Sequence, residues 1–341
     1  MLKFYLFTVG IVLFVSTLTS CGDRDSANGE DEVSPEFVFV IHGGAGVFNP
    51  DQLPEGREQE YLDAVNRALD IGSEILSGGG DALEAVEQAI IYLEDQPIFN
   101  AGRGAVFTSD GTNELDASIM DGRTRNSGAV GGVKNVKNPI TAARKVMEES
   151  PHVFMVGPGA EQFAASVGCD IVDPSYFYTA ERFEALQRRQ QREMETETED
   201  GDDAPTGTVG AVALDMNGNL AAGTSTGGMT NKRFGRIGDS PVIGAGTYAD
   251  NAGVAVSCTG HGEFFIRYAV AHDLNSRYKY QKISLDSAAS YIIHEKLAGI
   301  DATGGLIAVD RNGHYTMPFN TSGMIRGVVT SEYRKSAVYR D

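Results

Sequence analysis

The amino-acid sequence predicts an α+β fold in which β-sheets pack on one another and helices cover their outer faces. Of its 341 residues, 41% are hydrophobic and 22% are charged, which is enough for a globular unit with a full core. The 41 glycines interrupt apolar runs, as tight turns between strands do. In the second half, short strand-like segments follow one another without helices between them, which disfavours a doubly wound parallel sheet.

Residues 1–21 have the pattern of a targeting segment. Lys3 precedes an apolar run over residues 4–18 that is short for a membrane-spanning helix, and Leu18-Thr19-Ser20-Cys21 resembles a bacterial lipobox with Cys21 as the lipidated residue. Residues 22–35 are a polar, acidic tether. These features predict an exported protein, periplasmic or at the cell surface, that is anchored to the membrane by its lipid. An ordinary signal peptide cut near the same place is the alternative.

The folded part is predicted to begin at Glu36. Residues 37–41 form a continuous apolar run that predicts a buried strand, with a glycine loop over residues 42–46 after it. This loop lacks the spacing of a Rossmann fingerprint or a P-loop, which disfavours nucleotide binding. Further elements predicted in this half are helices over residues 58–76 and 82–94 (the latter capped by Asp81), a helix over 139–149, a strand over 153–156 and a helix from residue 160.

The composition changes between residues 179 and 206. Residues 180–192 predict a polar helix, and residues 193–203 then carry seven acidic side chains in eleven positions with no basic residue among them. Such a run cannot bury enough surface to order itself, so the segment 193–207 is predicted to be a disordered linker. A calcium site is the weaker alternative, because the acids lack the glycine and terminal-glutamate spacing of an EF-hand loop.

Beyond the linker the pattern is rich in strands. Asn217-Gly218 predicts a hairpin turn between the first two of them. The predicted elements are strands over residues 209–214, 219–226, 242–248 and 254–259, helices over 263–274 and 285–297, and a strand over 305–309. Residues 328–341 show no pattern that predicts an element.

The charge and the cysteine pattern exclude several classes of partner. With 28 basic and 47 acidic residues the formal net charge is −19, and such a field repels nucleic acid and anionic lipid. Cys21, Cys169 and Cys258 lack the spacing of a metal site or a redox motif. The six histidines are scattered, which disfavours zinc, and no catalytic cofactor is expected.

Thr208 opens the first strand after the acidic linker. A threonine hydroxyl is a poor nucleophile at neutral pH, but a cut before Thr208 would create a free α-amino group, which titrates near about 7.7–8.0 and can accept the hydroxyl proton. Gly207 tolerates strained backbone angles that would expose its carbonyl group to this hydroxyl. The alternative is a buried strand that simply begins with a β-branched residue.

Ordered motifs surround Thr208. They are Thr208-Val209-Gly210-Ala211-Val212-Ala213-Leu214-Asp215, Thr224-Ser225-Thr226-Gly227-Gly228, Gly235-Arg236-Ile237-Gly238-Asp239-Ser240-Pro241 and Thr259-Gly260-His261-Gly262-Glu263, with His42-Gly43-Gly44-Ala45-Gly46, Phe99-Asn100-Ala101-Gly102, Glu114-Leu115-Asp116-Ala117 and Pro318-Phe319-Asn320-Thr321 farther away. Together they resemble the isoaspartyl peptidase/plant-type asparaginase family of N-terminal nucleophile hydrolases. The likeness covers the chain from Phe37 to about Gly327.

The resemblance implies a four-layer αββα sandwich of the N-terminal nucleophile hydrolase type and a precursor that cuts itself between Gly207 and Thr208. Residues 36–207 would then form an α subunit and residues 208–341 a β subunit, together one folded domain that assembles as a dimer of such heterodimers. The implied activity is hydrolysis of β-aspartyl dipeptides and L-asparagine through a threonyl acyl-enzyme, with release of aspartate. The preference between these two substrates stays open.

The resemblance also implies roles for individual residues. Thr208 would attack the β-aspartyl carbonyl, Thr226 would hydrogen-bond this nucleophile, and Thr259 and Gly260 would form the oxyanion hole. The substrate's α-carboxylate would be bound by Arg236, whose forked guanidinium suits that task, and its α-ammonium by Asp239. The implied binding site also contains Ile237, Gly238, His261 and Gly262. Without the resemblance, the same residues would be interpreted as a turn cap, a surface ion pair and a bend.

A structural sodium ion is implied for the first half. Residues 99–104 resemble the family loop whose backbone carbonyls hold that ion. The implied ligands are Leu93, Glu94, Phe99, Ala101 and Arg103.

Two kinds of alternative remain. Glycosylasparaginases and threonine aspartases share the nucleophile, but Gly207 in place of Asp, together with the stretch from Gly238 to Pro241, favours the asparaginase branch. From a different class, the chain could be an uncleaved, lipid-anchored binding protein that only retains the fold. Release of aspartate from a β-aspartyl dipeptide would distinguish this protein from the enzyme.

Overall fold

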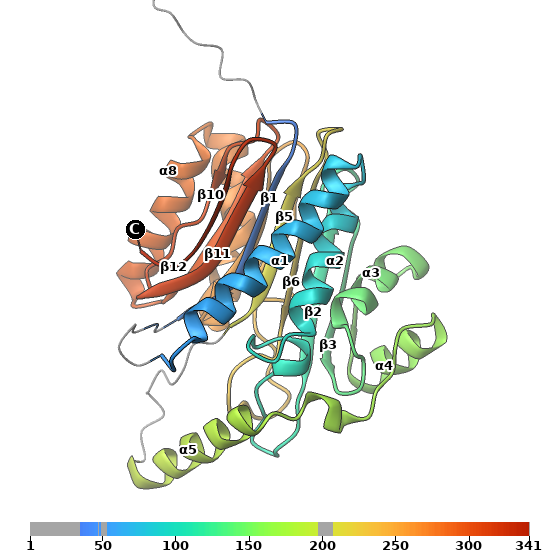
Figure 1. Ribbon diagram of the computed structural model, residues 1–341, viewed down its shortest axis with the longest axis vertical. Helices are drawn as coiled ribbons and strands as arrows, with labels where there is room; N and C mark the ends of the chain where they lie inside the picture. The colour runs from blue at the N-terminus through green and yellow to red at the C-terminus, as the bar shows by residue number, and fades with distance from the viewer. Residues whose placement is uncertain (1–34, 47, 49–52, 197–206, 341) are drawn as a thin grey trace, which may run out of the picture. The chain divides into compact units, whose positions relative to one another are not determined.

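Two β-sheets, one packed on the other, form the centre of the folded part of the chain (Figure 1). The computed structural model describes residues 35–46, 48, 53–196 and 207–340. The predictions for Cys21, for the tether up to residue 34 and for the linker from residue 197 to 206 therefore lie outside the described residues.

In the described part of the chain, the larger sheet has eight strands and the smaller sheet has four. The order across the larger sheet is β12 (Arg334–Tyr339), β11 (Gly323–Thr330), β1 (Val38–Gly46), β5 (Val209–Leu214), β6 (Leu220–Thr226), β2 (Leu115–Asp121), β3 (Ser127–Val133) and β4 (Phe154–Val156). The order across the smaller sheet is β10 (Tyr315–Thr316), β9 (Gly304–Asp310), β8 (Val254–Gly260) and β7 (Thr247–Ala249). Neighbouring strands are antiparallel, except that β3 and β4 are parallel.

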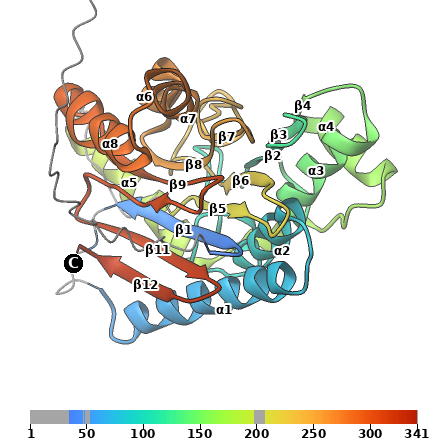
Figure 2. The same cartoon turned by 90° about the horizontal axis from the view of Figure 1, so that it is seen from above.

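Helices lie beyond both sheets. Figure 2 shows α1 and α2 on the outer side of the larger sheet, and α6, α7 and α8 beyond the smaller one. The α-helices are α1 (Arg57–Ser77), α2 (Ala82–Glu94), α3 (Pro139–Glu149), α4 (Gly157–Ser166), α5 (Ala180–Thr196), α6 (Gly262–Tyr268), α7 (Val270–Ser276) and α8 (Leu285–Ser290). Short 3-10 and π-helical turns are η1 (Gly102–Gly104), η2 (Pro174–Phe177), η3 (Arg277–Gln281), η4 (Tyr291–Leu297) and η5 (Ala298–Ile300).

The apolar run in β1 explains why the sheets stack. Successive side chains of a strand point to opposite faces, so a strand that is buried on both faces is apolar throughout. Phe39 and Ile41 pack in the core beneath the helices α1 and α2, whereas Val38 and Val40 pack in the core between the two sheets. A third core joins the smaller sheet to α6, α7 and α8. The predicted four-layer sandwich is confirmed.

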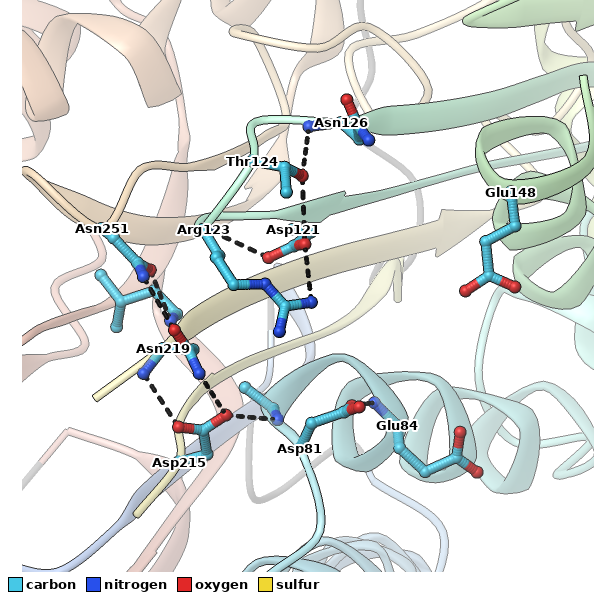
Figure 3. Close-up of polar contacts among 12 residues, drawn as sticks. Asp81, Glu84, Asp121, Arg123, Thr124, Asn126, Glu148, Asp215, Asn219 and Asn251 are labelled. Atoms are coloured by element: carbon cyan, nitrogen blue, oxygen red, sulfur yellow. Dashed lines mark hydrogen bonds and ion pairs between the residues drawn. The ribbon is translucent and has the colours of Figure 1, made fainter. Parts of the chain in front are cut away.

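The hairpin between β5 and β6 holds the two strands that carry the central motifs. The Asp215 carboxylate accepts hydrogen bonds from the backbone N–H groups of Asn217 and Asn219, both at 2.9 Å, and from that of Ala82 at 3.2 Å. Asn219 in turn accepts a hydrogen bond from the side chain of Asn251 at 3.0 Å, and Figure 3 shows it between Asp215 and Asn251. This turn therefore ties both strands to the start of α2.

Several local predictions need correction. The stretch 42–46 is the end of β1, not a glycine loop, although its pairing with β11 is irregular between His42 and Gly44. Within the predicted strand 242–248 only the end joins a sheet, as β7. The predicted helix 263–274 is broken in two at Ala269, whose φ of 46° is left-handed.

The predicted disordered linker also begins later than expected, because α5 extends to Thr196. Glu193 is paired with Arg189 at 2.9 Å and with Arg233 at 2.6 Å. Arg233 is forty positions from Glu193 in the sequence. The composition of the acidic run alone therefore does not reveal the basic residue that pairs with its first carboxylate. In the stretch from residue 328 onward, for which no element was predicted, residues 328–330 end β11 and residues 334–339 form β12.

Candidate active site

Thr208 lies immediately before β5, beside the end of β6. The register pairs Val209 with Ser225, which brings the next residues, Thr208 and Thr226, opposite each other. Their hydroxyl oxygens are 3.0 Å apart, and Thr226 Oγ1 also accepts a hydrogen bond from the backbone N–H of Gly228 at 3.1 Å. Both threonines are buried. The two motifs therefore form one hydroxyl pair at the junction that the sequence singled out.

The carbonyl group before Thr208 has a specific donor. Gly207 O accepts a hydrogen bond from the backbone N–H of Asn100 at 2.9 Å, and Asn100 O accepts one from Gly227 at 3.0 Å. The fully buried Asn100 side chain donates to Gly228 O at 2.7 Å. Asn100 thus joins the residue before Thr208 to the two glycines that follow Thr226. Sequence reasoning quoted it within a motif but assigned it no role, because a backbone donor has no signature in the sequence.

Arg236 and Glu263 form a bidentate ion pair. Arg236 Nε and Nη2 donate to the two oxygens of the Glu263 carboxylate at 2.8 and 2.7 Å. The hydrogen bond from His261, and after it the Arg236 guanidinium, hold the pKa of Glu263 well below its usual range. Glu263 therefore fixes one edge of the guanidinium fork, and the donors at Nη1 remain for a ligand. No role for Glu263 was predicted, although it ends the Thr259-to-Glu263 motif.

Asp239 is buried close to the same cation. Its Oδ2 atom has no hydrogen-bond partner among the described residues, and burial raises the pKa of Asp239 to about 7, although Arg236 opposes that rise. A β-carbon on Gly262 would lie 2.9 Å from Arg236 Nη2 and 3.0 Å from Asp239 Oδ1, so a glycine here leaves room for both side chains. A buried carboxylate oxygen without a partner suits a cationic ligand group.

A second cationic side chain, that of Lys232, lies close to Arg236, and the sequence analysis did not predict it. The Lys232 side chain is 1% exposed, and its Nζ donates to Glu114 O at 3.1 Å and lies 3.8 Å from Asp116 Oδ2. A β-carbon on Gly228 would be 3.1 Å from Lys232 Nζ and 3.5 Å from Arg236 Nη1. The two cations therefore flank the residue that donates to Thr226. Lys232 lies between two of the motifs, and a lysine in the sequence gives no signal of burial.

The other residues predicted for the site contact Arg236, Glu263 or the strands beside them. Thr259 is the second-last residue of β8, and its Oγ1 accepts a hydrogen bond from the backbone N–H of Ala45 at 3.2 Å. Gly260 has a φ of 152°, which favours glycine. A β-carbon on Gly238 would approach Arg236 Nη1 to 2.9 Å, whereas Ile237 packs on Gly131 of β3. His261 bonds Glu263 at 3.2 Å.

The loop that carries Lys232 and Arg236 is tied to helix α5. Glu193 accepts hydrogen bonds from Arg233 at 2.6 Å and from Asn231 at 2.9 Å. The C-terminal turns of α5 therefore hold the loop that carries Lys232 and Arg236.

The loop predicted to bind sodium offers oxygen donors. A β-carbon on Gly102 would overlap the carbonyl oxygen of Glu94, and one on Gly104 would overlap that of Phe99. These close approaches require a residue without a side chain at both positions, and backbone carbonyl oxygens are the kind of ligand that a hard cation prefers. Leu93 O and Ala101 O each accept a hydrogen bond, from the backbone N–H groups of Gln96 and Gly104, and a carbonyl oxygen has two lone pairs. The Arg103 guanidinium lies over the Tyr176 ring, a contact of its side chain and not of the backbone carbonyl that was predicted as the ligand. The described residues contain no cluster of three His, Cys, Asp or Glu side chains that could hold a metal ion.

Comparison with known proteins identifies close relatives. A family model described as asparaginase matches residues 35–338. The chain is 50% identical over 295 residues to the isoaspartyl peptidase of Escherichia coli, covering 85% of this chain and 91% of that protein. It is 46% identical over 328 residues to a putative isoaspartyl peptidase/L-asparaginase of Dictyostelium discoideum, covering 87% and 94%. It is 40% identical over 310 residues to the isoaspartyl peptidase/L-asparaginase of Rattus norvegicus, covering 90% of each.

The same comparisons correct the predicted localisation. The relatives, from Escherichia coli to the rat, are named as isoaspartyl peptidases and asparaginases, and nothing in those names describes export or a lipid anchor. Among the residues that the structure describes, no helix has the length and apolar character to cross a bilayer. The prediction of an exported, lipid-anchored protein was wrong by the comparison with these relatives, and the lipid-anchored binding-protein alternative finds no support in them because their names describe enzymes.

Proposed function

Because this chain belongs to the asparaginase family, we propose that it is an amidohydrolase that acts on β-aspartyl dipeptides and L-asparagine and releases aspartate. The observation that carries the proposal is the buried hydroxyl pair of Thr208 and Thr226, 3.0 Å apart, directly after the Gly207 carbonyl. The names of the relatives, isoaspartyl peptidase and L-asparaginase, support the substrate class. The chemistry has two stages, self-cleavage and turnover.

In the first stage, Thr208 Oγ1 attacks the carbonyl carbon of Gly207. A C–O bond forms, the C–N bond of the peptide breaks, and the nitrogen takes up a proton, so the Gly207 acyl group moves from nitrogen to oxygen. Water then hydrolyses this ester and leaves a Gly207 carboxylate and a free Thr208 amine. The Asn100 N–H, 2.9 Å from Gly207 O, supports this step because negative charge develops on that oxygen.

In the second stage, the free α-amino group of Thr208 accepts the proton of its own hydroxyl, which attacks the β-carbonyl of the aspartyl substrate. The leaving amine or ammonia departs with a proton, and water hydrolyses the acyl-enzyme to aspartate. Thr226 orients the nucleophile. Thr259 and Gly260 serve as oxyanion donors, a kind of contact whose loss typically lowers the rate by about 10²–10³.

Recognition rests on charge. Arg236, held along one edge by Glu263, binds the α-carboxylate with its remaining donors, and the unpartnered Oδ2 of Asp239 accepts from the α-ammonium. Both substrates present this same aspartyl half, so any preference between them depends on the leaving group.

The two fragments, residues 36–207 and 208–341, stay together as one domain in this proposal. The order across the larger sheet alternates between them, because β1 lies between β11 and β5, and β2 lies beside β6. Separation would break three strand pairings. Assembly of two such heterodimers is part of the proposal through the family resemblance. A structural sodium ion, held by Glu94 O and Phe99 O, would order the loop next to Asn100 and takes no part in the reaction steps.

Intact mass spectrometry of residues 35–341 tests the proposal. We expect two fragments with a junction at Gly207/Thr208, an uncut chain for Thr208→Ala, and slower cutting for Thr208→Ser, which keeps a hydroxyl. The cut protein should then release aspartate from a β-aspartyl dipeptide. A wild-type chain that remains whole and inactive under all conditions would refute the proposal.

A further inference from the structure

We infer that His42 is a positioning residue. A buried chain of hydroxyl groups fixes its ring, and the ring bonds the main-chain carbonyl of Thr208 and so keeps the nucleophile oriented after self-cleavage. The inference rests on the proposed function, since it concerns the new chain end that self-cleavage creates. His42 was noted in the sequence only as the first residue of a glycine-rich motif. Its contacts with Thr208 and Ser257 are tertiary.

The ring of His42 is fully buried and bonded at both nitrogens. Nδ1 lies 3.0 Å from Thr208 O, and Nε2 lies 2.9 Å from Ser257 Oγ. A carbonyl oxygen only accepts, so Nδ1 carries the proton, and in the neutral ring Nε2 accepts from the Ser257 hydroxyl. Burial lowers the pKa of His42 to about 3, against the opposing effect of the bond to Thr208, which is consistent with this neutral form.

Ser257 is itself fixed by further hydroxyls. Its Oγ is 2.6 Å from Thr224 Oγ1, which accepts from Thr247 Oγ1 at 2.7 Å, and Ser118 Oγ is 2.8 Å from Thr247. All of these side chains are fully buried. They come from β8, β6, β7 and β2, so the chain of hydroxyls crosses the otherwise apolar layer between the two sheets. A satisfied buried network of this kind is rigid, and its far end is the nucleophile's carbonyl.

Gly210 leaves the space that this network needs. It pairs with His42 across β5 and β1, and a β-carbon there would overlap both Ser257 Oγ and His42 Nε2. Any other residue at this position would push the imidazole or the serine aside. The glycine in the motif after Thr208 is thus explained by the contact between His42 and Ser257.

The cut makes this anchor necessary. Before the cut, Thr208 is held from its N-terminal side by Gly207, whose carbonyl bonds Asn100 at 2.9 Å. After the cut, Thr208 is a chain end that precedes the first paired residue of β5, and chain ends fray unless they are tied down. The His42 bond to its carbonyl then fixes the backbone from which both the hydroxyl and the amine project. Loss of this bond should therefore affect turnover more than self-cleavage.

Two substitutions of His42 separate positioning from packing. The amide nitrogen of Asn can take the place of Nδ1 and donate to Thr208 O, whereas the longer Gln reaches the position of Nε2 and bonds only Ser257. We expect His42→Gln to cut itself but to lose kcat by on the order of 10- to 100-fold with KM almost unchanged, the loss typical of a misplaced reacting group. His42→Asn should restore kcat to within about threefold of wild type.

Ser257→Ala provides a second variant, because it removes the anchor of the ring without touching Thr208. It should lower kcat about three- to tenfold, again with KM unchanged, and thermal unfolding of all variants controls for folding. The inference would be overturned if His42→Gln had the same kcat as wild type. It would also be overturned if the Asn and Gln variants lost kcat equally and in proportion to their loss of thermal stability. The proposed function fails separately, if wild type itself stays uncut or releases no aspartate, and the inference would fall with it.

Discussion

Replacing Asp239 with asparagine should make the protein more stable at neutral and alkaline pH, although it removes a substrate contact. The Asp239 side chain is buried, and its Oδ2 atom has no partner among the described residues. Without substrate, its ionised form is therefore poorly solvated, and asparagine has nearly the same shape without the charge. The site thus carries a cost in stability that a bound ammonium group would offset.

The magnitude follows from the pKa of Asp239, which burial raises from 3.8 to about 7. Each pKa unit corresponds to about 1.36 kcal/mol, so keeping Asp239 ionised in the folded state costs roughly 4 kcal/mol. Since the folded-state pKa is raised, the contribution of Asp239 to stability is fully present below its unfolded pKa and is lost as pH rises through about 7. The advantage of the Asp239→Asn variant should therefore grow between about pH 4 and pH 7 and stay constant above it.

Thermal unfolding of wild type and Asp239→Asn at a series of pH values measures this directly. For a domain of this size 1 kcal/mol corresponds to about 2 °C, so the Tm of the variant should exceed that of wild type by roughly 8 °C at pH 8. Asp110→Asn is the matched control, since it makes the same change of side chain at an exposed position. A variant that is less stable than wild type at pH 8, or a Tm difference that does not change with pH, would refute the reasoning.

Four further predictions concern the site and its surroundings. Glu263→Gln should raise KM for a β-aspartyl dipeptide about tenfold with kcat nearly unchanged in steady-state kinetics, because Arg236 loses the partner that orients it. Thr226→Val should lower kcat by on the order of 10²-fold in the same assay, since the nucleophile loses its hydroxyl partner at 3.0 Å; an unchanged kcat would remove Thr226 from the site. Because burial lowers the pKa of His42 to about 3, its contribution to stability is present above the unfolded pKa and is lost as pH falls toward 3, so denaturant unfolding should show less acid destabilisation in His42→Asn than in wild type. Exchange of sodium for tetramethylammonium should lower the Tm by a few degrees through the loop at residues 99–104, and an equal Tm in both salts would argue against the cation.

Local signals predicted several elements well. Helices α2 (Ala82–Glu94) and α3 (Pro139–Glu149) have the predicted bounds, because an N-cap at Asp81, whose side chain accepts from Glu84 N, and a proline at the first helical position act within one turn. Strand β12 (Arg334–Tyr339) was missed, because it is an edge strand whose exposed positions have little apolar character, and only its pairing with β11 makes it a strand.

For the site, the sequence by itself determined that Thr208 is the candidate nucleophile and that Arg236 and Asp239 are candidates to bind the substrate, because motif residues carry their chemistry in their side chains. The tertiary structure alone decided that Glu263 holds Arg236, that the Asn100 amide meets the Gly207 carbonyl, and that His42 reaches Thr208. These contacts join strands and loops far apart in the chain, and two of them involve backbone atoms that every residue possesses. No pattern of residue types records such contacts, since they arise only when distant segments of the chain meet in the fold.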